Sequence, residues 1–288
     1  MAGLEAKNLS FSYNDRNVVS GISFAAGTGE TWAVIGRNGA GKSTLLKCLC
    51  GLLRRHQGSI LISGVHIAKL TPREIALQIA YVPQGTNRRP PPFTVREYVQ
   101  MARYPYSGMG EVSTRKDRDA VGEALALTDT ERLAGRMMTT LSGGEFQAAL
   151  IAGAAAQETP FLLLDEPTTH LDPCHQENIR RVIERLHRQR GTTVITVTHD
   201  INFALSTHNN VLALVDGGVF FSGTKHLFCA DAADNLFKIF AVDFCAVERA
   251  GLETLFFVND NEFRRGDRPQ SPATPDNENP PVTTENPQ

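Results

Sequence analysis

Residues 36–44 read GRNGAGKST and fit the spacing G-x-x-x-x-G-K-[ST] of a phosphate-binding loop. In such a loop the glycines allow a tight turn, so that backbone amides and the positive end of the following helix point at a β-phosphate. We expect Lys42 to contact the β- and γ-phosphates and Ser43 to contact Mg²⁺. The candidate nucleotide-binding residues of this loop are Gly36, Asn38, Gly39, Ala40, Gly41, Lys42, Ser43 and Thr44.

Two adjacent carboxylates end the apolar run FLLLDEP at residues 161–167. A carboxylate at the end of a buried strand, beside the phosphates, can hold the metal through water, and Asp165 has this place. Glu166 comes one residue later and points to the other side. We therefore expect Glu166 to be the general base for the attacking water, a role worth roughly 10²–10⁴ in rate. A solvated surface pair is the alternative, which the four preceding apolar residues disfavour.

A second phosphate-binding shape occurs in residues 141–147, which read LSGGEFQ. Ser142, Gly143 and Gly144 stand at the start of a predicted helix, where free amides and the helix dipole favour an anion. No lysine accompanies them. One ATP-sized domain does not need two such elements, so these residues by themselves leave the role of the second one open.

Strands alternate with helices along most of the chain. We expect strands at residues 31–36, 78–84, 161–167, 192–200 and 211–223 (two strands about a Gly-Gly turn), and helices at residues 43–53 and from Pro173 onward, capped by Asp172. This alternation predicts an α/β fold with a largely parallel sheet. An all-helical block, from about residue 93 to 158, interrupts the alternation and is predicted to be an inserted lobe.

The composition is that of an ordinary globular protein, with 41% hydrophobic and 21% charged residues. The net charge of −2 provides no basic field for nucleic acid. No apolar run approaches the roughly 20 residues of a membrane-spanning helix. Residues 264–288 are rich in proline and nearly devoid of apolar side chains, so we expect a disordered tail.

Five stretches, GRNGAGKST, YVPQ, LSGGE, LLLDEPTTHLD and TVTHD, follow one another in the order and spacing of the ATP-binding subunits of ABC transporters. The chain resembles this family over about residues 3–258. The resemblance implies a P-loop NTPase (RecA-like) core with a mostly parallel sheet, an antiparallel β part and an inserted α-helical subdomain. It also implies one ATPase domain over residues 1–258, which binds ATP with Mg²⁺ and hydrolyses it to ADP and phosphate to drive transport.

Four further residues receive a role only through this resemblance. Tyr13 matches the aromatic side chain that stacks on adenine. Gln84 matches the glutamine that joins Mg²⁺ to the attacking water, and His199 matches the histidine that contacts the γ-phosphate. Asp172 matches the acidic residue of the loop that crosses to the partner subunit.

In this family two subunits pair head to tail, and each ATP is held between the phosphate loop of one subunit and the LSGG of the other. The resemblance therefore implies a homodimer in which Ser142, Gly143 and Gly144 complete the ATP site of the partner. The sequence departs from the family after LSGGE, because Phe146, Ala148 and Gly153 occupy positions that are usually basic. This departure leaves the rate and the coupling of the ATPase open.

The segment MARYPY at residues 101–106 and the ending at residues 242–258 resemble subunits that serve iron–siderophore, haem and cobalamin import. This resemblance implies a subunit at the cytoplasmic face of the inner (cell) membrane. Two membrane-spanning permease subunits would dock in a groove between the helical lobe and residues 84–92, and an extracytoplasmic binding protein would deliver the substrate. An exporter subunit and a soluble ATPase of iron–sulfur cluster assembly are alternatives. A nucleic-acid-linked ATPase is disfavoured by the net charge.

Overall fold

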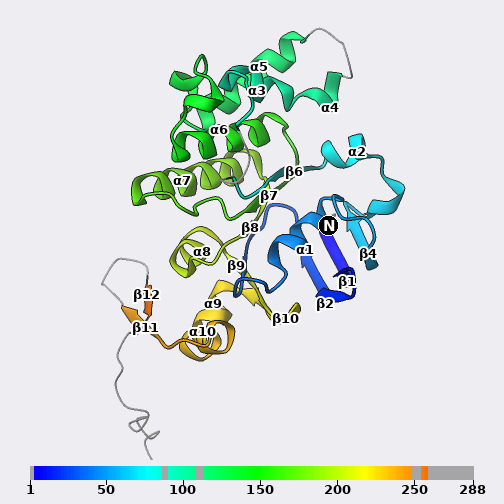
Figure 1. Ribbon diagram of the computed structural model, residues 1–288, viewed down its shortest axis with the longest axis vertical. Coiled ribbons are helices and arrows are strands. Elements are labelled where there is room, and N and C mark those ends of the chain that lie inside the picture. The colour runs from blue at the N-terminus through cyan, green and yellow to red at the C-terminus, as the bar shows by residue number, and fades with distance from the viewer. Residues whose placement is uncertain (1–2, 86–89, 108–112, 248–253, 259–288) are drawn as a thin grey trace, which may run out of the picture. The chain divides into compact units, whose positions relative to one another are not determined.

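The computed structural model describes residues 3–85, 90–107, 113–247 and 254–258 (Figure 1). All of them belong to one compact unit, residues 1–258. The predicted tail at residues 264–288 lies outside the described residues. Within the described part of the chain, no helix combines the length and the apolar character that crossing a membrane requires.

A six-stranded sheet forms the centre of this unit, in the order β10-β9-β3-β8-β7-β6. Its strands are β3 (Thr31–Ile35), β6 (Ile79–Val82), β7 (Phe161–Asp165), β8 (Thr193–Val197), β9 (Asn210–Val215) and β10 (Gly218–Thr224). All neighbours pair in parallel except β9 and β10. Every residue of β3, β7 and β8 is buried, as expected for strands covered on both faces. The prediction of a mostly parallel sheet is confirmed.

A second sheet is antiparallel and has the order β2-β1-β4-β5. Its strands are β1 (Leu4–Tyr13), β2 (Arg16–Ala26), β4 (Gln57–Ile62) and β5 (Val65–His66). Apolar side chains of this sheet, of helix α1 (Lys42–Leu49) and of one face of the central sheet form a single core cluster. Helix α1, and with it the phosphate loop, is therefore fixed between the two sheets.

Helix α1 ends earlier than the sequence predicted, at Leu49 instead of residue 53. Gly51 follows with a φ of +72°. The amides of Leu52 and Leu53 turn back and donate to the carbonyl oxygen of Lys47 at 2.9 and 3.1 Å. A glycine in the left-handed region stops a helix in this way, because the following amides satisfy its last carbonyls.

Helices cover the other face of the central sheet. Helices α6 (Gly143–Ala156) and α7 (Pro173–Arg190) share a core cluster with β6, β7 and β8. Helices α8 (Ile201–Thr207), α9 (Lys225–Ala230) and α10 (Ala232–Phe240) share another with β3 and β9. Short elements complete the unit: η1 (Ile67–Lys69) and α2 (Pro72–Ala76) lie between β5 and β6, and η2 (Glu131–Leu133) and η3 (Met138–Thr140) precede α6.

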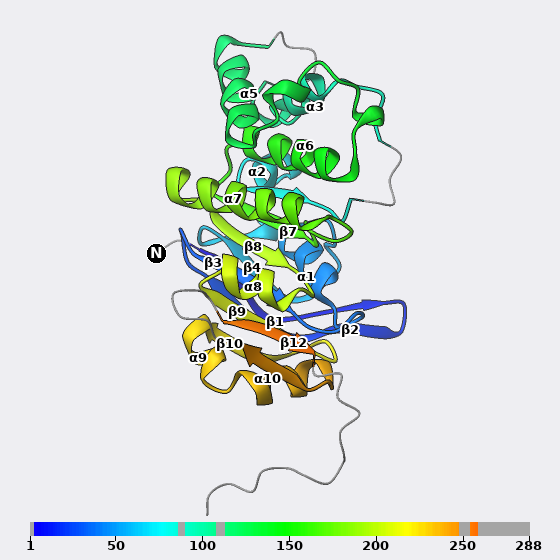
Figure 2. The ribbon, with the colours of Figure 1, turned by 90° about the vertical axis from the view of Figure 1, so that its left-hand side faces the viewer.

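The predicted all-helical block is present. It contains α3 (Val95–Met101), α4 (Tyr104–Ser107), α5 (Arg115–Leu127) and α6, which we call the helical lobe. Figures 1 and 2 show α3, α5 and α6 at the end of the unit away from the antiparallel sheet. Capping boxes start α3, α5 and α6, at Thr94, Thr114 and Ser142 respectively, and each satisfies amide groups that the helix itself leaves free.

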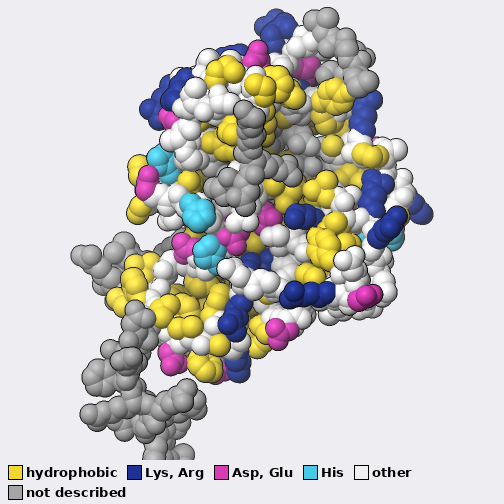
Figure 3. Space-filling view, in the orientation of Figure 1, with side chains coloured by type: hydrophobic (Ala, Val, Ile, Leu, Met, Phe, Trp, Pro, Cys, Tyr) yellow, Lys and Arg dark blue, Asp and Glu magenta, His cyan; other side chains and the backbone are white. Residues whose placement is uncertain are grey.

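The last elements are two short antiparallel strands, β11 (Phe244–Val247) and β12 (Leu255–Val258). Exposed hydrophobic side chains gather over α10, β11 and β12, among them Phe237, Leu255 and Phe257 (Figure 3). The turn between β9 and β10 consists of Asp216 and Gly217, both with positive φ, and not of the Gly-Gly pair that the sequence suggested. Two successive positive φ values are typical of the hairpin turn that matches strand twist.

A buried arginine ties the helical lobe together. Arg103, which is 1% exposed, contacts Asp117 on α5 through its Nε at 3.1 Å. Its Nη1 donates to Glu158 at 2.6 Å and to the carbonyl oxygen of Ala156 at 2.7 Å, and its guanidinium lies 3.9 Å from the ring centre of Tyr106. These contacts join the end of α3 to α5 and to the end of α6.

Arg103→Met should therefore lower the free energy of unfolding by about 3–5 kcal/mol, because buried Asp117 would keep its hydrogen bonds from Thr114 but lose the positive charge that pairs with it. Arg115→Met, which removes an exposed pair with Asp119, should change it by less than about 0.5 kcal/mol. Urea denaturation measures both values. Adding Asp117→Asn to Arg103→Met should recover part of the loss. Equal stabilities of the two arginine variants would contradict this account.

Candidate active site

The phosphate loop joins β3 to α1, as predicted. Gly41 has a φ of +91°, and a Cβ there would lie 2.4 Å from the carbonyl oxygen of Val18. Gly36 has a φ of +151°, and its Cβ would lie 2.4 Å from the carbonyl oxygen of Leu214. Both distances are too short for any side chain. The tight turn of this loop therefore depends on glycine at both ends, because backbone from β2 and β9 lies against it.

The ammonium group of Lys42 lies inside the turn of this loop. Its Nζ donates to the carbonyl oxygens of Gly36 at 2.7 Å and Arg37 at 3.0 Å, and the residue is 5% exposed. Burial lowers the pKa of Lys42, while the negative charges of Glu166 and Asp165 oppose this shift. The loop therefore holds a cation close to two acids, in the place where phosphate oxygens would be bound.

Asp165 is held by two hydroxyl groups from different elements. Ser43, on α1, donates to its Oδ1 at 2.8 Å, and Tyr81, on β6, donates to its Oδ2 at 3.1 Å. Burial raises the pKa of Asp165, and the two hydrogen bonds oppose this shift. Tyr81 pairs with Leu163 in the parallel register of β6 and β7, so its side chain lies on the same face of the sheet as Asp165, two residues further along β7.

Glu166 adopts a left-handed backbone conformation with a φ of +50°. Its amide donates to the carbonyl oxygen of Val197 at 2.9 Å. Its Oε2 accepts a hydrogen bond from Thr169 Oγ1 at 2.6 Å and lies 2.7 Å from Nδ1 of His199. A non-glycine residue in this region is strained, and such strain is common at functional sites. The structure thus brings the predicted base and the predicted γ-phosphate histidine into direct contact.

A cavity of about 620 Å³ lies beside these groups, and we call it the phosphate cavity; Lys42, Ser43, Glu166 and His199 line it, and Asp165 does not. It is lined by Val18, Asn38, Gly39, Gly41, Lys42, Ser43, Thr44, Gln84, Glu166, Thr169, His170 and His199. Of the predicted loop residues, Gly36 and Ala40 are buried and do not line it. Thr169 and His170 are additions that the sequence did not single out, although both belong to the stretch LLLDEPTTHLD.

The corner around Ser43 fits a magnesium ion by its chemistry. A hydroxyl (Ser43), a carboxylate (Asp165) and an amide (Gln84) were predicted to hold the metal. The first two are hydrogen-bonded to each other, and Gln84 lines the same cavity as Ser43. All three offer oxygen atoms, which are the ligands that Mg²⁺ prefers.

Tyr13 is placed at the margin of this arrangement. It is the last residue of β1 and pairs with Arg16 across the hairpin, and Val18, two residues further along β2, lines the phosphate cavity. Tyr13 itself does not line that cavity; it is 45% exposed and packs edge-to-face on Phe11 at 4.9 Å. Its adenine-stacking role stays a prediction.

Ser142 caps the start of helix α6. Its Oγ accepts from the amide of Glu145 at 3.3 Å, and its own amide donates to Glu145 Oε2 at 3.0 Å. Neither Ser142 nor Gly144 lines the phosphate cavity. Gly143 lines a smaller, adjoining cavity of about 240 Å³, which shares Gln84, Glu166, Thr169 and His170 with the phosphate cavity. The start of α6 therefore lies beside the phosphate cavity of its own chain without lining it.

Asp172 belongs with this second group and not with the first. Its Oδ1 accepts from the amide of His175 at 2.9 Å, which caps α7 as the sequence predicted, and its Oδ2 lies 2.7 Å from Nδ1 of the same residue. The hydrogen bond from the His175 amide holds the pKa of Asp172 below its usual value. A Cβ on Gly144 would lie 2.0 Å from Cδ2 of His175, so the imidazole packs directly on Gly144. No sequence pattern pointed to a role for His175.

The comparisons with known proteins agree with this geometry. A family model described as ABC transporter matches residues 19–169. The iron(3+)-hydroxamate import ATP-binding protein FhuC of Bacillus subtilis is 37% identical over 241 residues, which cover 83% of this chain and 89% of the relative. The ferric enterobactin transport ATP-binding protein FepC of Escherichia coli is 34% identical over 240 residues, which cover 83% of this chain and 88% of the relative.

Two solved structures have a similar fold. One is a chain of a transporter assigned to the metal-chelate type, in an inward-facing conformation, with a TM-score of 0.77 and 28% identity over 91% of this chain and 99% of that one. The other is a bacterial ABC transporter cassette solved as a dimer, with a TM-score of 0.68 and 29% identity over 77% of this chain and 98% of that one.

ATP-binding subunits of this kind form dimers, work with membrane permease subunits and hydrolyse ATP coupled to transport. The sequence matches cover most of the chain, and the phosphate loop, the acid pair at the end of β7 and the fold agree with them. This chain belongs to the family of ABC transporter ATP-binding subunits.

Proposed function

We propose that this chain hydrolyses ATP as one half of a homodimer and thereby powers the import of an iron–siderophore complex or a related metal chelate. The observation that carries the proposal is that Ser142, Gly143, Gly144 and Asp172 do not line the phosphate cavity of their own chain. A phosphate-binding helix start that does not line its own chain's phosphate cavity can serve a phosphate that is bound by another copy.

For hydrolysis, Lys42 and the loop amides would bind the β- and γ-phosphates. A bound Mg²⁺, held by Ser43, Asp165 and Gln84, would neutralise charge on the phosphate oxygens. Glu166 would accept a proton from the water that attacks the γ-phosphorus, while the oxygen bridging to the β-phosphate leaves with ADP. His199, beside Glu166 at 2.7 Å, would contact the γ-phosphate and orient the carboxylate.

Glu166→Gln should lower ATP turnover by about 10²–10⁴-fold, because the amide keeps the shape of the side chain but cannot accept the proton. Binding of ATP should persist, and the ATP-bound dimer should accumulate. Phosphate release measures turnover, and light scattering after gel filtration measures the dimer. Glu177→Gln, which changes half-exposed ion pairs with Arg180 and Arg181 on α7, is the control and should keep full turnover. Unchanged turnover of Glu166→Gln would remove Glu166 as the base.

The homodimer would place Ser142 and the amides of Gly143 and Gly144 of each copy against the γ-phosphate bound by the other. Ser142 and Gly143 are exposed, as such a contact requires. Asp172, whose side chain is 60% exposed, lies beside them through His175 and would cross to the partner in the same contact. Free amides and the helix dipole suffice to bind an anion there, so the absence of a lysine is no obstacle.

In the Glu166→Gln background, Ser142→Arg should prevent the ATP-dependent dimer, because a long cation would fill the space of the partner's phosphate. Single subunits should still bind ATP. Ser142→Ala is the matched control: it loses the same helix cap, worth about 1 kcal/mol, without adding bulk, and should still dimerise. Light scattering with and without ATP distinguishes the two. A normal dimer of Ser142→Arg would contradict the shared site.

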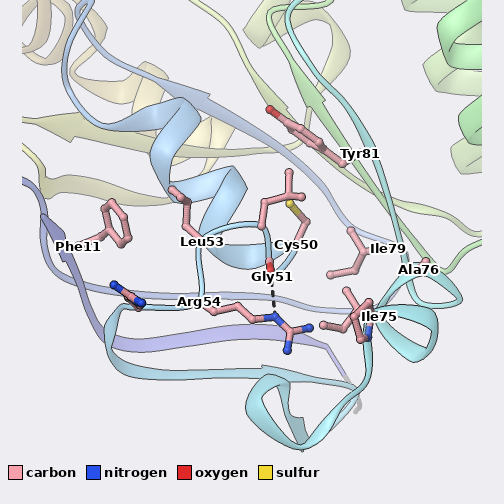
Figure 4. Close-up of a pocket in the computed structure, with 12 residues that line it drawn as sticks. Phe11, Cys50, Gly51, Leu53, Arg54, Ile75, Ala76, Ile79 and Tyr81 are labelled. Carbon is pink, nitrogen blue, oxygen red and sulfur yellow. Dashed lines mark hydrogen bonds between the residues drawn. The ribbon is translucent and has the colours of Figure 1, made fainter. Parts of the chain in front are cut away.

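We propose that the permease subunits dock in a groove formed by two cavities of about 660 and 270 Å³ that share Tyr81; Figure 4 shows the larger one. Of residues 84–92, which the sequence predicted as one wall of the docking groove, those that the structure describes line neither cavity. The larger cavity is lined mainly by apolar residues and also by Arg54 and Arg55. The smaller cavity is lined by Tyr98 and Gly153 of the helical lobe, among others. A Cβ on Gly153 would lie 2.9 Å from the Tyr98 ring, so this aromatic takes the space beside a position that is usually basic in the family. The groove suits an apolar helix with acidic residues. Residues 86–89 of the predicted docking segment lie outside the described residues.

The cargo class follows from the relatives, whose names refer to iron(3+)-hydroxamate and ferric enterobactin. A strain that lacks this chain should lose uptake of ⁵⁵Fe-labelled siderophore. The wild-type gene should restore uptake, and the Glu166→Gln variant should not. In the same strain, growth with haem as the sole source of iron, or with cobalamin supplied only from the medium, distinguishes the related cargoes. Normal use of siderophore iron, haem and cobalamin by this strain would overturn the import proposal. For an importer, we expect the membrane subunits to hold the chain at the cytoplasmic face of the membrane.

A further inference from the structure

Tyr81 contacts both the proposed docking groove and Asp165 of the candidate active site. Its ring lines both cavities of the proposed docking groove, and its hydroxyl donates to Oδ2 of Asp165 at 3.1 Å. Figure 4 shows this hydroxyl pointing away from Ile75 and Ile79, out of the apolar part of the groove. The ring packs against the core cluster that contains α1. One rigid side chain therefore spans the distance between the groove and the acid.

The carboxylate of Asp165 has two oxygens, and the structure gives each a hydroxyl donor. Ser43 donates to Oδ1 and Tyr81 to Oδ2, so rotation of the carboxylate about its bond to Cβ would break both contacts. Asp165 is 2% exposed, so little water can replace a lost donor. A group that orients a metal-holding carboxylate in this way controls the affinity of the metal without touching it.

We propose that Tyr81 is a positioning residue: its hydroxyl sets the orientation of Asp165 for Mg²⁺, and its ring makes that orientation depend on what occupies the groove. The inference rests on the ATP site of the proposed function. In this proposal one side chain, that of Tyr81, links the surface where a membrane subunit would dock to the residues that would hold the nucleotide's metal.

Tyr81→Phe tests the first part, because it keeps the ring in the groove and removes only the hydroxyl. The readout is binding of a fluorescent, non-hydrolysable ATP analogue to the full chain as free Mg²⁺ is raised. The free Mg²⁺ at half-maximal binding should rise roughly tenfold or more, while binding in EDTA should stay as in wild type. Tyr106→Phe, which removes a phenolic hydrogen bond to the Gln157 carbonyl at 2.8 Å, is the matched control and should leave the midpoint unchanged.

Leu52→Trp tests the second part. Leu52 lines the larger cavity and is 63% exposed, so an indole there should enter the groove without disturbing the core. It should shift the Mg²⁺ midpoint by about twofold or more in wild type and leave it unshifted in Tyr81→Phe, because coupled sites are not additive. Equal shifts in both backgrounds, or none in either, would overturn the link to the groove.

A Tyr81→Phe midpoint equal to that of wild type would overturn the positioning role. These outcomes are separate from failure of the proposed function. Normal iron uptake in the deletion strain would reject the import proposal and leave the role of Tyr81 intact, whereas a wild-type chain whose binding of the analogue does not respond to Mg²⁺ would reject both.

Discussion

A buried carboxylate at the end of β7 governs the arrangement of this site. Desolvation of Asp165 is costly, and it is tolerated because hydroxyl groups from α1 and β6 compensate it and the Lys42 ammonium lies close by. Together with the carboxylate on β7, these groups come from three segments that are far apart in the sequence. They meet only because β6 and β7 are parallel neighbours and α1 is fixed over the same face of the sheet by the antiparallel sheet above it.

The strain at Glu166 follows from the same strand end. Asp165 belongs to the sheet and faces α1, and the chain must turn at once for the next side chain to reach the phosphate cavity. The positive φ of Glu166 makes that turn, and the hydrogen bond from its amide to Val197 of β8 holds it. Two consecutive acids thus have different surroundings: one is buried beneath Ser43, and the other faces His199 and the cavity.

Much of this site could be predicted from the sequence, because its chemistry is local. The phosphate loop, Asp165, Glu166 and the cap at Asp172 each follow from spacing within a few residues. Tyr81 and His175 could not be predicted, since Tyr81 matters through the pairing of β6 with β7, and His175 through its contact with a glycine 31 positions earlier on another helix. Strands β1 and β2 escaped notice because register shifts interrupt the alternation of β1. Gly51 is a sequence signal that a helix ends just before it, so the expected continuation of α1 to residue 53 was wrong. The limits of the helical insertion at residues 93–158 and of the tail at residues 264–288 stay predictions.

The contact between His175 and Gly144 leaves no room even for a methyl group. The starts of α6 and α7 therefore lie ring against backbone, with the imidazole also held by Asp172. The first turns of α6 and α7 cannot move closer together. If either helix rotates outward, His175 and the Asp172 that holds it must move as well. The two segments that would reach a neighbouring molecule form a single rigid surface. Engagement with that neighbour would then be all-or-none, made and broken in one movement and not residue by residue.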